Sequence, residues 1–105
     1  LSAEGESSSS IRARVEAARV LQYKRNGMGM LNAALSMDDI RTHCMMDTIG
    51  KKLLEDASDR LALSARAMTR ILKVSRTIAD MDASANITSR HLEEALTYRA
   101  FDRSL

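Results

Sequence analysis

The chain has 105 residues, a length that suits one small domain. Its formal charge of +2 is too small to indicate nucleic-acid binding by itself, and no apolar run is long enough to span a membrane. Hydrophobic residues make up 45% of the chain but aromatic residues only 3%, and there is no Pro. This composition favours helices around an aliphatic, methionine-rich core.

Cysteine usage bears on the compartment of the protein. One cysteine, Cys44, excludes an internal disulfide and fits a reducing environment, so we expect a cytoplasmic protein without a membrane partner. The sequence shows no signal peptide. It starts at Leu1 without an initiator methionine, and we therefore expect a piece of a longer chain.

The first ten residues, LSAEGESSSS, are polar and rich in serine, which predicts a flexible linker over residues 1–10 and a helical domain over 11–105. Ser9 or Ser10 is expected to cap a first helix over 11–25. Its narrow apolar stripe consists of Ile11, Val15, Ala18 and Leu21 or Gln22. The other faces are basic, with Arg12, Arg14, Arg19, Lys24 and Arg25. A solvated basic face is the simpler interpretation, and contact with an acidic partner or nucleic acid is the functional one.

Two further helices, one short and one long, are predicted after a turn at residues 26–35, NGMGMLNAAL. The apolar side chains of this turn are expected to cover the core; they are Met28, Met30 and Leu31. Ser36 and Asp39 form an S-x-x-D capping box, which predicts a short helix over 37–44. Asp47 should cap a helix over 48–61, whose core side chains would be Ile49, Leu53, Leu54 and Ala57.

Residues 61–81 show the clearest helical pattern in the chain, and Ser64 can cap this helix. Each residue of a helix turns by about 100°. One broad face is therefore apolar, with Met68, Ile71, Leu72, Ser75, Ile78 and Ala79. The opposite side is predicted to be a basic ridge, formed by Arg66, Arg70 and Lys73 with Arg76 beside them. This helix should organise the fold.

Arg66 is the unusual residue of this helix, because it lies in the first turn. The helix dipole already places partial positive charge there, so a cation is disfavoured by about 0.3–1 kcal/mol. Free backbone N–H groups and a guanidinium together suit an anion such as phosphate. From physical chemistry alone, the simpler interpretation is an arginine that points into water.

The last helix is expected to start at Thr88 or Ser89, after a loop over 82–87, and to end near Arg99. Its core side chains would be Leu92, Ala95, Leu96 and Tyr98. Phe101 is expected to pack the C-terminal tail back against the rest of the domain. Residues 102–105 are expected to fray. The sequence thus predicts an all-α bundle of four main helices and one short helix.

Other chemistry has little support in the sequence. There is no G-x-x-x-x-G-K-[ST] phosphate loop, so a complete ATPase is not encoded. His43, Cys44 and His91 are poor candidates for a metal site, and a Cys44–His91 nucleophile pair is equally weak. The two histidines are interpreted as ordinary, partly exposed residues, and Glu93 and Glu94 as solvated.

Four separated segments, in the right order, carry a family resemblance from about Gly5 to Arg103. They are GESSSSIRARVEAARVLQ, LNAALS, LSARAMTRILKVSRTIAD and NITSRHLEEALTYRAFDR. Together they resemble the C-terminal end of the magnesium-chelatase-like AAA+ ATPases, the ComM/YifB family.

The resemblance implies a small helical lid domain beside a nucleotide-binding domain. It makes Arg66, in the S-x-R segment, the sensor 2 arginine that contacts nucleotide phosphate, with Arg70 as the alternative. The parent enzyme would use ATP and Mg²⁺, whereas the fragment would hold no cofactor and catalyse nothing. Its partners would be the ATPase core of the same chain and neighbouring subunits of a ring, with DNA as a partner that the whole assembly could contact.

Two other interpretations fit the pattern. One is a stand-alone nucleic-acid-binding helical module, which the basic first helix favours and the low net charge opposes. The other is a histone-fold-like dimerisation module, because a long central helix followed by a short loop and an amphipathic helix is typical of both folds. The segment ARAMTR favours the lid.

Overall fold

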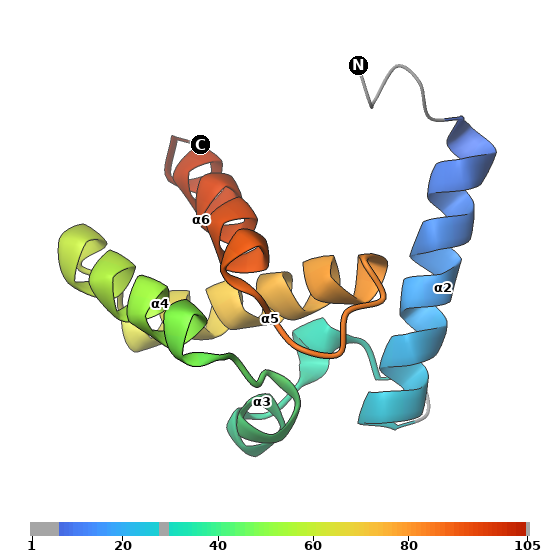
Figure 1. Cartoon of the computed structure of the whole chain (residues 1–105), viewed down its shortest axis with the longest axis horizontal. Helices are drawn as coiled ribbons and strands as arrows, with labels where there is room; N and C mark the ends of the chain where they lie inside the picture. Colours follow the sequence, from blue (N-terminus) through green and yellow to red (C-terminus); the bar gives the residue numbers. More distant parts are fainter. Residues whose placement is uncertain (1–6, 28–29, 105) are drawn as a thin grey trace.

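The computed structural model describes residues 7–27 and 30–104, the last six of these by their backbone alone. Within these ranges the chain is helical (Figure 1). In order, the elements are α2 (Ser8–Asn26), the 3₁₀ turn η1 (Asn32–Ala34), α3 (Met37–His43), α4 (Thr48–Leu61), α5 (Ala65–Met81) and α6 (Ser89–Ser104). The predicted all-α bundle of four main helices and one short helix is confirmed.

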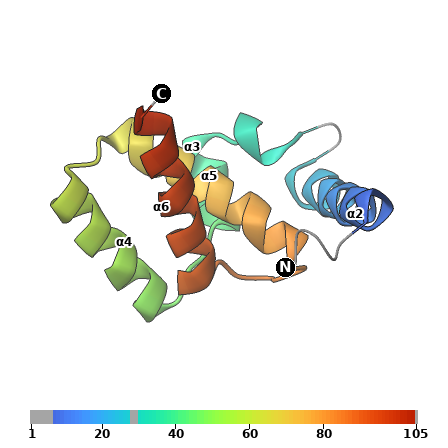
Figure 2. The ribbon, with the colours of Figure 1, turned by 90° about the horizontal axis from the view of Figure 1, so that it is seen from above.

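Helix α5 lies at the centre of the fold, as its sequence pattern predicts. It contacts α2, η1, α3 and α6, while α4 packs against α6. Figure 2 shows α4 and α6 on one side of α5 and α2 on the other. The only pairing of extended backbone within the described ranges is a parallel bridge between Met46 and Ile87, which ties the start of α4 to the start of α6.

Polar side chains begin the helices. The capping box of Ser36 and Asp39 is present, and Asp47 and Ser64 cap α4 and α5 as predicted. The first helix begins earlier than expected, because Ser7 rather than Ser9 or Ser10 accepts the capping hydrogen bond, from the N–H of Ser10 at 3.1 Å. Residues 8–10 are therefore helical, and only 1–6 of the predicted linker lie outside the described residues.

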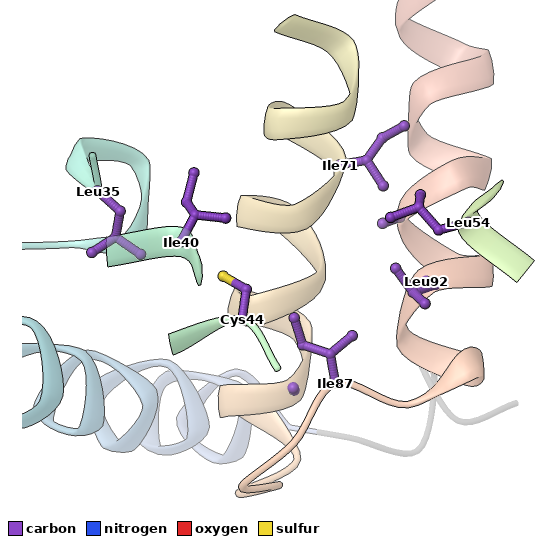
Figure 3. Packing of buried hydrophobic residues seen from close by; sticks show 9 residues of the cluster. Leu35, Ile40, Cys44, Leu54, Ile71, Ile87 and Leu92 are labelled. Atoms are coloured by element: carbon purple, nitrogen blue, oxygen red, sulfur yellow. The ribbon is translucent and has the colours of Figure 1, made fainter. Parts of the chain in front are cut away.

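The apolar core joins α3, α4, α5 and α6 (Figure 3). Leu54, Ile71 and Leu92 are buried in it, as predicted. Leu53, Leu72, Ile78 and Leu96, also predicted in the core, lie partly buried against the same cluster. The prediction that Tyr98 faces the core is wrong, because its side chain is 50% exposed and lines an open groove instead. Met30 also packs there, whereas Leu31 is exposed. Met28, the Phe101 side chain and Leu105 lie outside the described residues.

Ile49 was predicted to face the core, but its side chain is 69% exposed. The reason is the close approach of α4 to its neighbours at Gly50, where an added Cβ would lie 3.3 Å from Leu92 Cδ1. Gly50, Leu54 and Ala57 form the buried stripe of α4. Ile49 lies about 100° from Gly50 around the helix and therefore faces outward.

Candidate functional site

Arg66 lies in the first turn of α5, and its side chain is exposed. Ser64 holds the start of the helix, because its Oγ accepts from the Ala67 N–H at 3.1 Å and its carbonyl accepts from the Met68 N–H at 2.9 Å. The first turn contains no acidic residue. Among the residues that the structure describes, no carboxylate pairs with the guanidinium of Arg66. An arginine presented in this way can reach an external anion.

The alternative residue, Arg70, is also exposed and follows one helical turn later. It differs from Arg66 because it takes part in an interaction within the chain. Lys73, predicted on the same ridge, is half-buried, and its Nζ donates to the Ala33 carbonyl at 2.9 Å. This contact ties α5 to η1, so Lys73 has a structural partner.

Arg76 was predicted to belong to the basic ridge, and this prediction is wrong, because its side chain is only 1% exposed. Its Nε donates to Asp80 Oδ1 at 3.1 Å. Its terminal nitrogens donate to the carbonyls of His43, Ala85 and Ser84 at 3.1, 2.9 and 2.6 Å. Burial lowers the pKa of this guanidinium, and the Asp80 carboxylate opposes that shift. Arg76 therefore stabilises the fold.

Asp80 is the centre of a buried polar network. Its two oxygens accept from the two terminal nitrogens of Arg25 at 2.8 and 2.9 Å, and Oδ2 also accepts from Asn32 Nδ2 at 3.0 Å. Gln22 Oε1 in turn accepts from the Asn32 N–H at 3.0 Å. Arg25, predicted as part of a solvated basic face, is thus half-buried and joins α2 to α5. Every buried side-chain nitrogen and oxygen that the structure describes has a partner.

His91 was predicted to be partly exposed, yet it is only 2% exposed. Its Nδ1 accepts from the Thr88 N–H at 3.0 Å, so Nε2 carries the proton and donates to Asp82 Oδ2 at 2.9 Å. This hydrogen bond is the main reason that the pKa of Asp82 lies below its usual value, and the Arg90 guanidinium lowers it further. His91 therefore closes the first turn of α6 instead of serving as a ligand or base.

The weaker candidates have ordinary surroundings. Cys44 is buried in the apolar core, and burial raises the pKa of its thiol, which makes it unreactive. Within the described ranges, no three His, Cys, Asp or Glu side chains gather where they could hold a metal ion. Glu93 and Glu94 are exposed. The helices between residues 7 and 104 include none that is long and apolar enough to cross a membrane.

The helical architecture defines a small all-α domain whose central helix begins with an exposed arginine. Residues 5–99 match the family model described as magnesium chelatase, subunit ChlI C-terminal. The chain belongs to this family.

Individual relatives extend the match to almost the whole chain. The chain is 48% identical over 101 residues to the protein YifB of Escherichia coli strain K12, a match that covers 96% of this chain and 20% of YifB. It is 44% identical over 101 residues to competence protein ComM of Haemophilus influenzae, covering 96% of this chain and 19% of ComM. The chain thus spans about a fifth of the length of the curated relatives it matches.

Proposed function

We propose that this chain is the lid domain of a ring-forming AAA+ ATPase and that Arg66 is its sensor 2 residue. The observation that carries the proposal is the position of Arg66 at the start of the central helix, where its side chain is exposed and pairs with no carboxylate of the described residues. A guanidinium offers directed donors in a planar fork and a charge that does not titrate, which suits a terminal phosphate oxygen of ATP. The family assignment and the greater length of the relatives support the same interpretation.

The lid would act through its rigidity. Arg66 lies on the same helix as the buried Arg76 and Asp80. A displacement of Arg66 on binding nucleotide phosphate would therefore move α5 as a unit, together with the loop before α6 that Arg76 holds. Phosphoryl transfer is catalysed mainly by positioning and by stabilising charge on the transferred group. In this proposal the ATPase core of the same polypeptide supplies ATP and Mg²⁺ binding, and neighbouring subunits of the ring sense the lid position.

The chain alone is predicted to hydrolyse no ATP, and this is the experiment that tests the lid assignment. One or two arginines cannot offset the translational and rotational freedom that a ligand loses on binding, so ATP affinity should be about millimolar or weaker. ATP turnover is measured for the 105-residue chain and for a full-length protein of the family that contains it. Turnover by the full-length protein only is the expected result, whereas robust turnover by a pure preparation of the chain alone would overturn the proposal.

A further inference from the structure

The face of α2 that points toward α5 is covered along only half of its length. Ala18 and Gln22 are 3% and 6% exposed, but Ile11 and Val15, on the same face at spacings of four and three residues, are 40% and 36% exposed. Figure 1 shows the reason, because the first half of α2 extends beyond α5. An apolar stripe that is buried at one end and open at the other indicates a surface for another part of a protein.

A groove of about 530 Å³ lies beside this open stripe. Its lining comes from α2, η1, α5 and α6 and includes Arg14, Val74, Ile78, Met81, Glu94 and Tyr98. Two of the apolar residues in it are well exposed, Val74 at 39% and Tyr98 at 50%. Val20, on the outer face of α2, is also exposed but does not line the groove.

The groove stays open because α2 is held by polar contacts. The buried apolar cluster of the described residues contains no residue from α2. Instead, Arg25 pairs with Asp80 and Gln22 bonds to Asn32, both near the C-terminal end of α2. Apolar packing therefore does not draw the first half of α2 onto α6, and the space between these helices remains available.

We propose that this groove seats an apolar segment of the domain that precedes the chain in a longer protein of the family. The inference rests on the proposed lid function. The relatives YifB and ComM are about five times longer than the matched region. A preceding domain would join at the start of α2, which is the end where the apolar stripe is exposed (Figure 1). A tethered domain is present at high effective concentration, which favours contact with a small groove more than a free partner would.

The basic residues of α2 favour an occupant with acidic residues and disfavour a second copy of the chain. In the first half of α2 the basic residues are Arg12 and Arg14, of which Arg14 lines the groove, whereas Arg25 is taken up by Asp80 at the other end of the helix. Acidic residues beside the apolar ones of the occupant would therefore be favourable where it meets the first half of α2. A second copy that inserted its own α2 would bring like charges together, which is unfavourable.

Thiol labelling tests the proposal, because Cys44, the one native cysteine of the chain, is buried. Val74→Cys places a thiol in the groove, and Val20→Cys is the matched control on the outer face of α2. Alkylation rates at each site are measured by mass spectrometry of the labelled peptide, for the 105-residue chain and for the full-length protein without nucleotide. We expect labelling of Val74→Cys to slow by about tenfold or more in the full-length protein, as for sites that react only after local opening, while Val20→Cys is unchanged.

Two results would overturn the proposal. Equal rates for Val74→Cys in both proteins would mean that the groove is open to solvent in the full-length protein. An alkylation rate of Val74→Cys that is already slow in the 105-residue chain, and that falls further as the protein concentration rises, would mean that a second copy fills the groove. Neither result depends on ATP hydrolysis, so failure of the groove is distinguishable from failure of the proposed ATPase function.

Discussion

Arg76 and Asp80 lie one turn apart on α5 and form an ion pair in which each side chain is 1% exposed. The same carboxylate binds Arg25 from α2 and Asn32 from η1. Two arginines therefore depend on one buried aspartate. Removing that charge leaves the buried guanidinium of Arg76 without its counter-charge and Arg25 without its partner, which is more costly than losing a surface ion pair.

Asp80→Asn should accordingly destabilise the chain by about 3–5 kcal/mol, the usual cost of breaking a buried charge pair. Asp56→Asn is the matched control, because Asp56 pairs with Lys52 on the surface, where the side chains are 55% and 72% exposed. The control should change the free energy of unfolding by less than about 1 kcal/mol. Urea unfolding measures both variants, and equal small losses would show that the network is not a stabilising element.

The sequence predicts the helix starts better than it predicts the fate of the charged residues. Ser36, Asp47 and Ser64 act locally, through hydrogen bonds to the next turn, so their roles can be inferred from neighbouring residues. The burial of Arg25 depends on Asp80, which lies 55 residues further along the chain. No local periodicity encodes such a contact. The spacing of Arg76 and Asp80, four residues apart on one helix, is the one local signal of this network.

The packing of individual helices also depends on contacts that local periodicity does not encode. Helical periodicity predicts that Ile71 is in the core, and this is confirmed at 2% exposed. It also predicts that Ile49 is in the core, and this is wrong, because Gly50 brings α4 close to Leu92 and turns Ile49 outward. For the candidate site, the exposure of Arg66 follows from the sequence pattern, but its phosphate contact comes only from family resemblance.

A matched pair of isoleucine truncations tests this account of the core. Ile71→Ala should destabilise the chain by about 2–5 kcal/mol, because it leaves a cavity among buried side chains. Ile49→Ala makes the same chemical change at a position that is 69% exposed, so it should shift stability by at most about 0.5 kcal/mol. Thermal and urea unfolding give both values. A cost for Ile49→Ala as large as that for Ile71→Ala would contradict the packing of α4.

Stability should fall at acid pH partly through Asp82. Its pKa in the folded chain lies below the ordinary aspartate value of 3.8, mainly because His91 donates a hydrogen bond to it. Its contribution is therefore complete above the unfolded-state pKa and is lost as the pH falls through the folded-state pKa. Since the carboxylate is 39% exposed, solvent screening limits the contribution to under about 1 kcal/mol.

Asp82→Asn should thus be less stable than the natural chain near neutral pH, and the difference should shrink in strong acid. Urea unfolding over a pH series measures it. Asp38→Asn serves as the control, because Asp38 is 90% exposed in its pair with Arg41 and should show little difference at any pH. A stability gap for Asp82→Asn that stays constant from neutral to acid pH would contradict the assignment.

The central claim is that Arg66 contacts nucleotide phosphate, and ATP turnover by the full-length protein tests it most directly. Arg66→Ala should leave the melting temperature of the 105-residue chain almost unchanged, because the side chain is exposed and no described carboxylate holds it. In the full-length protein it should lower ATP turnover by about one or more orders of magnitude, the scale typical of arginines that stabilise phosphoryl transfer.

Two arginine variants complete this measurement. Arg70→Ala should have a smaller effect than Arg66→Ala, and Arg60→Ala, at the exposed end of α4, should have none. Normal turnover by Arg66→Ala with loss in Arg70→Ala would move the phosphate contact to Arg70. Loss of turnover in Arg66→Ala with an unchanged fold is the expected result, and full activity of both Arg66→Ala and Arg70→Ala would contradict a phosphate contact by either arginine.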